Sequence, residues 1–387
     1  MLTNSKKTSL FILYILGFIF AFTSSLPAYV NSTFLTDLTN EQIVGVFYII
    51  SSFFSIISLV FIPKILKRFG NFKVTLFLSI LYLLNFIGLA FTQNISLVLF
   101  CFMLSGTIAT TIYFDIDVFI EHNSSDIKTG KIRSIYLTCI NLAWLVSPWI
   151  AGMIVEEYSI RTVYLIVAII IVPIIMIILL GLKSFKDPEY KTFEIIDTIK
   201  NIKLNKNIKN IIFSSLLLQM FFSLMVVYTP IYLNKYLGFD WSTIGIILSI
   251  MLLPFIFIQI PLGYLADKKF GEKEILTIGF IIMAIFTAII PMIHSKSFMV
   301  IALVLFMTRV GAAMVEVMND TYFFKQINDK NLNVINIYRM STPSAYIISL
   351  VIATILLSFI PFNYIFYVLA IIMFFALRYS LAIKDTR

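Results

Sequence analysis

Charged residues are scarce in this sequence, and so are the residues that build disulfides and metal sites. Only 13% of the 387 residues are charged, against about a quarter in soluble domains. The chain holds two cysteines and two histidines, so neither a disulfide framework nor a metal site is expected. It also lacks a glycine-rich nucleotide-binding loop. We therefore expect no cofactor and no direct use of ATP.

Apolar residues are abundant instead, at 60% of the chain with a mean hydropathy of +0.98. A water-soluble protein could not bury so much apolar surface, whereas a bilayer accepts it. The net charge of +9 does not indicate a nucleic-acid partner, because the basic residues fall in short loops between apolar runs. The composition predicts a protein whose main partner is the lipid bilayer.

Twelve apolar runs are long enough to cross the hydrocarbon core, which takes roughly 20 residues. We predict spans at residues 8–30, 42–63, 73–92, 95–120, 132–155, 160–182, 210–233, 242–265, 274–293, 298–323, 334–359 and 362–382. Basic residues then give the orientation. With the N-terminus inside, 25 of the 29 lie on the cytoplasmic side, Arg161, Lys235 and Lys296 lie outside, and Arg309 falls within a span. This asymmetry predicts a multi-pass protein of the cell (inner) membrane with both termini cytoplasmic.

The spans divide into two groups of six around a long polar stretch. We predict an N-terminal bundle at 1–182, a cytoplasmic linker at 183–209 and a C-terminal bundle at 210–387. Isoleucines recur at helical spacing among the linker lysines, which is typical of a basic amphipathic helix on the inner leaflet. A solvated linker fits the same residues.

Two segments of the first half recur in the second. Residues 63–73 resemble residues 263–273, and residues 106–115 resemble residues 311–320. Repeats of this kind in corresponding halves indicate a duplicated six-helix unit. The predicted fold is an all-α membrane protein of twelve transmembrane helices in two pseudo-symmetric six-helix bundles.

The second copy of the loop carries a family resemblance. Its pattern of Gly263, Leu265, Ala266, Asp267, Lys268, Lys269, Gly271 and Lys273 resembles the loop signature of the major facilitator superfamily. The run from Tyr228 to Leu233 is similar to the seventh helix of that superfamily. The resemblance implies a monomeric transporter in which spans one, four, seven and ten line a central cavity, while spans three, six, nine and twelve face lipid. The first copy departs from the signature, with Pro63 for the first glycine and Lys67 for the aspartate.

The loop signature predicts a cytoplasmic gate. Gly263 and Gly271 permit a tight turn, and Asp267 can accept hydrogen bonds from a helix start. The resemblance implies that this helix start belongs to span five of the other half. With Lys268 and Lys269, the loop can instead be a plain topology-setting turn.

Acid–base pairs at the inner ends of the spans extend the predicted gate. Asp115 ends span four and Arg133 begins span five, while Asp320 ends span ten and Arg339 lies near the start of span eleven. These residues can form symmetric gating pairs, or pairs that only fix helix packing.

Span ten holds the main candidates for the transport pathway. Arg309, Glu316 and Asp320 are spaced to share one helix face, and a charge near the bilayer centre costs at least ~2.5 kcal/mol unless it faces protein or water. We predict that Arg309 attracts an anionic or polar substrate group and that Glu316 carries a proton. Structural pairing of Glu316 with Arg309 or Arg339 is the alternative.

Further pathway candidates are Gln219, Tyr228, Asn141, Tyr29 and Asn31, all polar residues within or at the ends of spans. Each can equally serve helix packing.

Span five contains Ala143, Ser147, Pro148, Ala151 and Gly152 at the spacing of an antiporter motif that it resembles, with small residues at the glycine positions. The predicted function is secondary active transport of a small molecule by alternating access, coupled to protons, with a lean toward efflux. A sugar or organic-anion importer, a non-transporting sensor and a lipid scramblase with the same fold are the alternatives. An enzyme is not predicted, because no nucleophile–base or metal-ligand spacing occurs.

Overall fold

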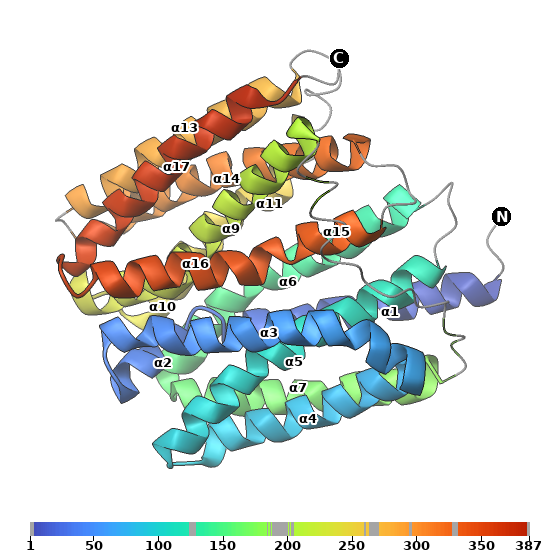
Figure 1. Cartoon of the computed structure of the whole chain (residues 1–387). Coiled ribbons are helices and arrows are strands. Elements are labelled where there is room, and N and C mark those ends of the chain that lie inside the picture. The colour runs from blue at the N-terminus through green and yellow to red at the C-terminus, as the bar shows by residue number, and fades with distance from the viewer. Residues whose placement is uncertain are drawn as a thin grey trace. The chain divides into compact units, whose positions relative to one another are not determined.

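All secondary structure in the described part of the computed structural model is helical (Figure 1). The structure describes residues 4–123, 129–183, 185, 187, 200, 202, 205–258, 261–262, 271–293, 296–326 and 332–384. The first half contains α1 (Asn4–Ser25), α2 (Asn31–Leu38), α3 (Glu41–Phe69), α4 (Asn71–Phe91), α5 (Ile95–Asn123), α6 (Thr129–Glu157) and α7 (Ile160–Gly181). The second half contains α9 (Lys206–Ile231), the π-helix η1 (Tyr232–Tyr236), α10 (Trp241–Leu252), α11 (Pro254–Phe257), α13 (Glu272–Ile289), η2 (Ile290–Met292), α14 (Phe298–Gln326), α15 (Leu332–Arg339), α16 (Ser341–Leu356), η3 (Phe362–Tyr364) and α17 (Ile365–Ala382).

Ten helical segments among the described residues are long and apolar enough to cross a membrane. Two shorter apolar stretches, Leu10–Ser25 and Trp241–Phe257, lie within the predicted spans 8–30 and 242–265. A helix is the expected form for every span, because the hydrocarbon offers no partner to a free backbone N–H or C=O. The chain is therefore a multi-pass membrane protein, and the count of twelve stays a prediction.

The chain divides into two compact units. Unit 1 comprises Met1–Asn40 and Ile50–Phe193, and unit 2 comprises Glu41–Ile49 and Glu194–Arg387. The first two turns of α3 thus group with unit 2. There Tyr236 at the end of η1 donates a hydrogen bond of 2.6 Å to Glu41.

Each unit pairs its helices in the same way. In unit 1, α4 packs against α5 and α7, and α1 packs against α6. In unit 2, α13 packs against α14 and α17, and α9 packs against α16, as the upper part of Figure 1 shows for α13 and α17. These pairings join corresponding predicted spans in the two halves, as a duplicated unit requires.

A buried pair of serines marks the corresponding contact in each unit. Ser25 of α1 and Ser147 of α6 lie 2.5 Å apart between their hydroxyl oxygens. Ser223 of α9 and Ser349 of α16 lie at the same distance. Small residues at these positions let the helices approach closely, and the hydroxyl pair satisfies polar groups that would otherwise face apolar surroundings.

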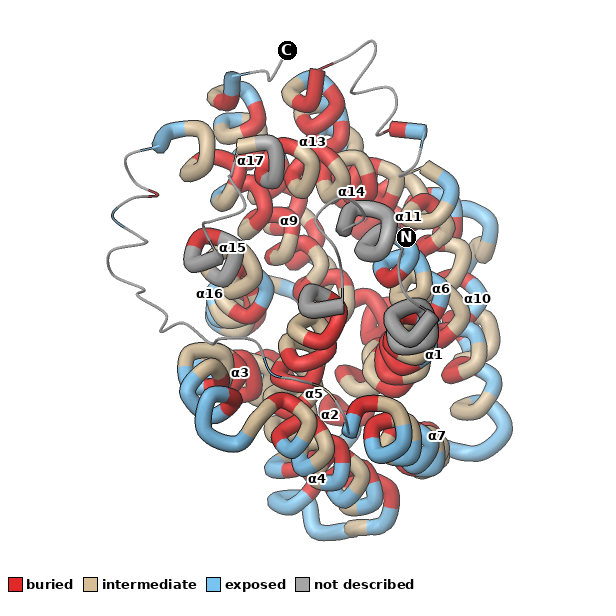
Figure 2. Tube along the Cα trace, turned by 90° about the vertical axis from the view of Figure 1, so that its right-hand side faces the viewer, coloured by how far each residue is buried: buried red, intermediate tan, exposed pale blue. Residues whose placement is uncertain are grey.

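The helices predicted to face lipid expose large apolar side chains. Leu84 of α4, Leu180 of α7, Ile285 of α13 and Phe374 of α17 are exposed by 59%, 81%, 52% and 68%. Figure 2 shows exposed residues along the outer sides of α4 and α7. Apolar surface of this kind is stable against acyl chains. Helix α14, predicted to line the cavity, also exposes Met299 by 72%, so the lipid-facing role of these four helices stays a prediction.

Helices α13 and α14 touch through their backbones at a pair of glycines. A Cβ atom on Gly279 would lie 2.9 Å from the carbonyl oxygen of Gly311, and one on Gly311 would lie 2.6 Å from that of Gly279. Any larger residue at either position would push the two helices apart. Glycine here places α14, which carries the charged residues, directly against α13.

A carboxylate fixes the start of α10 after the loop that follows η1. Asp240 is the N-cap, and its Oδ2 accepts hydrogen bonds from the Ser242 hydroxyl and, at 3.0 Å, from the Thr243 backbone N–H. These hydrogen bonds, that of Ser242 first, lower the pKa of Asp240 to about 2. The carboxylate therefore stabilises this helix start in its charged form.

Replacing this cap should destabilise the protein. Asp240→Ala is expected to lower the free energy of unfolding by about 1 kcal/mol, measured by thermal unfolding of the purified chain at neutral pH. Asp240→Asn is the matched control, because asparagine also caps. The pKa of Asp240 is lower in the folded protein than in the unfolded chain. The stabilisation that this carboxylate gives the fold is therefore present above the unfolded pKa of about 3.9 and is lost as the pH falls toward 2. The Asn variant should lack that loss, and equal destabilisation in both variants would contradict a capping role.

Candidate functional site

A polar cavity of about 210 Å³ lies between α9, α14 and the junction of α15 and α16, all within unit 2. Nine of its lining residues are polar or charged and one is apolar. The lining consists of Ser215, Leu218, Gln219, Glu316, Asn319, Asp320, Tyr338, Arg339, Ser341 and Thr342. A polar hollow inside an apolar helix bundle is the expected setting of a transport site.

The first wall of the cavity is formed by α9. The Asn205 side chain caps this helix by accepting hydrogen bonds from two backbone N–H groups, at 3.1 and 3.2 Å. Ser215, Leu218 and Gln219 are spaced three and four apart, so they share one face of the helix. On the same side, the buried Ser214 hydroxyl donates a 2.7 Å hydrogen bond to Oδ1 of Asn319, which ties α9 to α14.

The second wall is formed by α14, which supplies two carboxylates. Glu316, Asn319 and Asp320 also lie three and four apart and line the cavity together. Glu316 and Asp320 are half-buried, and Asn319 is buried. Two carboxylates in a membrane-spanning helix are costly unless they face a polar space, and the cavity supplies that space.

Tyr338 of α15 holds Asp320 in place. Its hydroxyl donates a 2.6 Å hydrogen bond to Oδ1 of Asp320. The Tyr338 ring stacks on Phe323 with the ring centroids 4.0 Å apart and the planes 17° apart, which restrains the phenol. Arg339, the next residue, also lines the cavity, so a guanidinium and two carboxylates share it.

The third wall is a break in the helix of predicted span eleven. Helix α15 ends at Arg339 and α16 begins at Ser341, with Met340 between them. Pro343 in the first turn of α16 has no backbone N–H to donate to the preceding turn, which accounts for the interruption. Ser341 and Thr342, the first residues of α16, line the cavity. The positive end of the α16 dipole therefore lies beside it.

Arg309 lies in α14 outside the residues that line this cavity. It is 1% exposed, and its guanidinium carbon lies 5.0 Å from the Phe221 ring centroid and 5.3 Å from that of Phe222. Such contacts stabilise a cation by about 2 kcal/mol when it is desolvated. Glu316 follows Arg309 by seven positions, or about 10 Å of helix. The two residues share α14, and only Glu316 lines the cavity.

The remaining pathway candidates lie apart from this cavity, except Gln219, which lines it. Tyr228 is buried in α9 and meets Phe362 edge-to-face, with centroids 5.8 Å apart. In unit 1, Asn31 accepts a 2.9 Å hydrogen bond from the Tyr164 hydroxyl. Two more candidates lie in unit 1. Tyr29 is buried with its ring edge-on to Trp144, and Asn141 is half-buried in α6.

The gate candidates are spread over both units. Asp115 of α5 is fully buried, with Oδ2 accepting a 3.2 Å hydrogen bond from the Thr75 hydroxyl. Arg133 belongs to α6, and its side chain is not among those described. Gly271 is the buried N-cap of α13. Gly263, Asp267, Lys268 and Lys269 lie outside the described residues. Asp320 and Arg339, by contrast, line the polar cavity.

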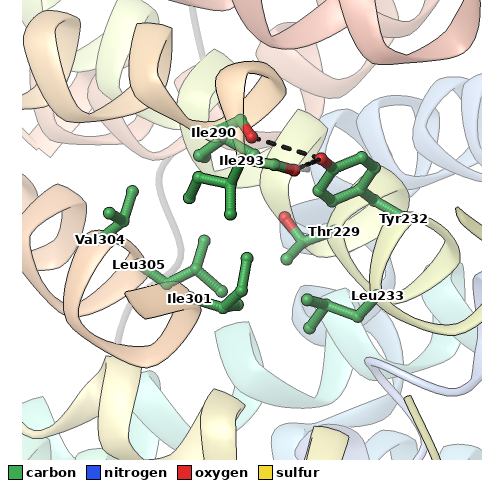
Figure 3. A pocket seen from close by; sticks show the side chains of 8 residues that line it. All are labelled: Thr229, Tyr232, Leu233, Ile290, Ile293, Ile301, Val304 and Leu305. Atoms are coloured by element: carbon green, nitrogen blue, oxygen red, sulfur yellow. Dashed lines mark hydrogen bonds between the residues drawn. The ribbon is translucent and has the colours of Figure 1, made fainter. Parts of the chain in front are cut away.

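A second hollow in unit 2 is apolar and too narrow for a water molecule (Figure 3). Isoleucine, valine and leucine side chains surround it. The Tyr232 hydroxyl at its rim lies 3.3 and 3.4 Å from the backbone oxygens of Ile290 and Ile293, to which it donates. This hollow offers no free polar group to a substrate. Within the described ranges, no group of three or more His, Cys, Asp or Glu residues is placed to hold a metal ion.

Six of the ten lining residues were not predicted from the sequence, and these are Ser215, Leu218, Asn319, Tyr338, Ser341 and Thr342. The helix break beside Ser341 was not predicted either. Pro343 within a predicted span is a signal for the break, because proline interrupts a helix. Asn319 carries the weaker signal of an amide one turn after Glu316 on the same face. Nothing in the sequence marks the Tyr338 contact.

Removing the phenol hydroxyl of Tyr338 should loosen this wall. Tyr338→Phe keeps the stacking on Phe323 and deletes the hydrogen bond to Asp320, with an expected loss of about 1 kcal/mol in the free energy of unfolding. Tyr379→Phe is the matched control. The Tyr379 ring stacks on Phe213, with the ring centroids 5.2 Å apart, and neither residue lines the cavity. The effect of Tyr379→Phe should stay within about 0.5 kcal/mol. Thermal unfolding of the purified variants measures both, and equal stability of the two would contradict the contact.

The family model described as the Major Facilitator Superfamily matches residues 13–330 and 211–385. A sequence search of curated proteins finds no significant match.

Several solved transporter structures share the fold. A POT family transporter in complex with 5-aminolevulinic acid superposes with a TM-score of 0.78 at 14% identity, over 96% of this chain and 94% of that one. An auto-inhibited POT family peptide transporter gives 0.79 at 11% identity, over 98% of each chain. The nucleoside transporter NupG, in a variant form, gives 0.74 at 12% identity, over 98% of this chain and all of that one. At these identities the likeness shows the fold alone.

Proposed function

Because the chain belongs to the Major Facilitator Superfamily, a family of transporters and not of enzymes, we propose that it is a proton-coupled secondary transporter of a small polar molecule. It works by alternating access between two six-helix bundles of a monomer in the cell membrane, with both termini cytoplasmic. Solved transporters of the same fold that carry peptides or nucleosides, or that hold 5-aminolevulinic acid, support a small polar cargo.

The polar cavity beside α14 is the observation that carries this proposal. It brings Glu316 and Gln219, candidates for the pathway, together with Asp320 and Arg339, candidates for the gate. Substrate recognition and gating therefore share one set of side chains. A carboxylate that lines such a cavity can bind a proton on one side of the membrane and release it on the other, which is the requirement for coupling.

Glu316 is the proposed proton carrier. It is half-buried in a membrane-spanning helix and opens onto the cavity, so its charge is costly in a closed state and tolerated in a hydrated one. Arg339 shares the cavity and can compensate the carboxylate when it is ionised. The alternative, a structural Glu316–Arg339 pair, predicts no change in coupling when the charge of Glu316 is removed.

The test separates coupling from transport. The cargo is identified by comparing the metabolites that cells release with and without the protein. Its rate of transport is then measured in proteoliposomes with and without a pH gradient. Glu316→Gln should abolish stimulation by the gradient, because the amide cannot carry a proton, while exchange of labelled for unlabelled cargo persists. Glu274→Gln, on the exposed face of α13, is the matched control and should behave as the unaltered protein. Gradient dependence that survives in Glu316→Gln would remove this residue from coupling.

The gate is proposed on the loop signature. Asp267, followed by Lys268 and Lys269, closes the cytoplasmic side by accepting hydrogen bonds from the start of span five, and the closure releases as the halves rock. Asp115 with Arg133 and Asp320 with Arg339 are the acid–base pairs that accompany it. Asp267→Asn replaces a charged acceptor of helix N–H groups by a neutral, weaker one. A cysteine introduced into the cavity lining should then react several-fold faster with a thiol reagent added from the cytoplasmic side. Unchanged accessibility of that cysteine in Asp267→Asn would contradict a role of Asp267 in closing the cytoplasmic gate.

Export is the proposed direction of transport, and it rests on the antiporter-like motif of span five. In unit 1, Ala143, Ser147 and Ala151 of that motif are buried, and the Ser147 hydroxyl meets Ser25 of α1. The small residues of the motif thus let α6 and α1 pack closely, which seals the space between them. Release of the identified cargo from loaded cells against its gradient distinguishes export from uptake.

A further inference from the structure

The polar cavity of unit 2 contains a buried amide group with no partner for its hydrogens. Asn319 is 1% exposed, and its Oδ1 accepts from Ser214 at 2.7 Å. Its Nδ2 is buried and makes no hydrogen bond. An unsatisfied buried donor costs about 1–3 kcal/mol. Because an NH₂ group only donates, whatever satisfies it must present an acceptor oxygen.

Two other groups at the same cavity favour an acceptor oxygen that is anionic. Arg339 brings a guanidinium, which donates only and binds carboxylates with two parallel hydrogen bonds. Helix α16, of 16 residues, begins with its positive dipole end at Ser341 and Thr342, both in the lining. Broken helices in transporters present their half-helix N-termini to anionic substrate groups in this way.

The α14 side of the cavity has the opposite preference. Glu316 and Asp320 supply two carboxylates, and the Tyr338 hydroxyl keeps Oδ1 of Asp320 oriented at 2.6 Å. Carboxylates accept hydrogen bonds and attract a cation such as an ammonium group. A simple anion would meet this repulsion, and a simple amine would leave the Asn319 NH₂ group unsatisfied. Neither alone suits the whole lining.

The size of the cavity limits the ligand further. Its volume of about 210 Å³ is below the range of about 300–1,000 Å³ that is typical of pockets for drug-sized ligands. Carbon atoms of the polar side chains line part of the cavity beside Leu218, which suits the short carbon chain of a small ligand. The space and its chemistry suit a short chain with a charge at each end.

We propose that this cavity binds a small zwitterion, an amino acid with a short carbon chain, as the cargo of the transporter. Its carboxylate lies against Asn319, Arg339 and the start of α16, and its ammonium group lies against Glu316 and Asp320. The inference rests on the proposed function only in taking the cavity as the transport site. Binding itself can be measured without any transport.

Calorimetric titration of the purified full-length chain in nanodiscs tests the proposal. Glycine, β-alanine and γ-aminobutyrate are the zwitterionic probes and differ in the separation of their charges. Propylamine and propionate are the matched probes with one charge each. The best zwitterion should bind at least about tenfold more tightly than either singly charged probe, because each lacks one set of charge-assisted hydrogen bonds.

A near-isosteric variant shows whether Asn319 faces the carboxylate. Asn319→Asp retains an acceptor for Ser214 and replaces the NH₂ group by a carboxylate oxygen. It should weaken the binding of the zwitterions and of propionate by at least about tenfold, because the new carboxylate repels their anionic end. Propylamine has no anionic end and should bind equally or more tightly. Retained propylamine binding also shows that the variant is folded. Asn94→Asp, the same change at an exposed helix start in unit 1, should alter nothing.

Three results would overturn the inference. They are the absence of measurable binding for all three zwitterions up to ~10 mM, propylamine or propionate binding as tightly as the best zwitterion, and an equal loss for every probe in Asn319→Asp. Proton-coupled transport of another cargo alongside any of these would leave the proposed function standing. Zwitterion binding with unchanged coupling in Glu316→Gln would instead keep this inference and remove the proton role.

Discussion

The cost of placing charge in hydrocarbon governs the arrangement of unit 2. Helix α14 carries Arg309, Glu316 and Asp320 within a segment long enough to span a membrane, and each of these groups needs a polar or aromatic setting there. The structure supplies two different settings. Aromatic rings receive the guanidinium of Arg309, and a cavity receives the carboxylates. Helices α9, α15 and α16 supply the other walls of that cavity.

Four of the ten residues that line the cavity, Gln219, Glu316, Asp320 and Arg339, were predicted from the sequence, and the distances between them were not. Rare charges in apolar runs pointed to Glu316, Asp320 and Arg339, because such charges are expensive and so are seldom accidental. Periodicity on one helix also predicted that Glu316 and Asp320 share a face. Helix periodicity could not predict that three helices meet at the cavity. Asn319 contacts Ser214, which is 105 positions away, and Tyr338 contacts Asp320, which is 18 positions away. Glu316 and Gln219 were assigned from the sequence to a substrate pathway and Asp320 and Arg339 to a separate gate, and the cavity contains members of both groups.

The internal repeat explains the framework better than the site. Serine pairs at corresponding helix contacts, Ser25 with Ser147 and Ser223 with Ser349, show the same packing solution in each unit. The repeated acids have diverged. Asp115 is fully enclosed and bonded to Thr75, whereas Asp320 opens onto a cavity and is bonded to a tyrosine. The two acids at corresponding positions of the predicted repeat therefore have different surroundings, one enclosed in the packing and the other open to a cavity.

The backbone contact between Gly279 and Gly311 has a mechanical consequence. The carbonyl oxygens lie close to the opposite glycines, and Met283 and Val315 fill the space beside them, so α13 and α14 cannot approach further at this crossing. Helix α14 bears Glu316, and α13 presents Ile285 on its exposed side. A shift of α13 caused by lateral pressure or bilayer thickness is therefore expected to move α14 with it. Turnover of the protein should depend on the lipids around it as well as on the ions in solution.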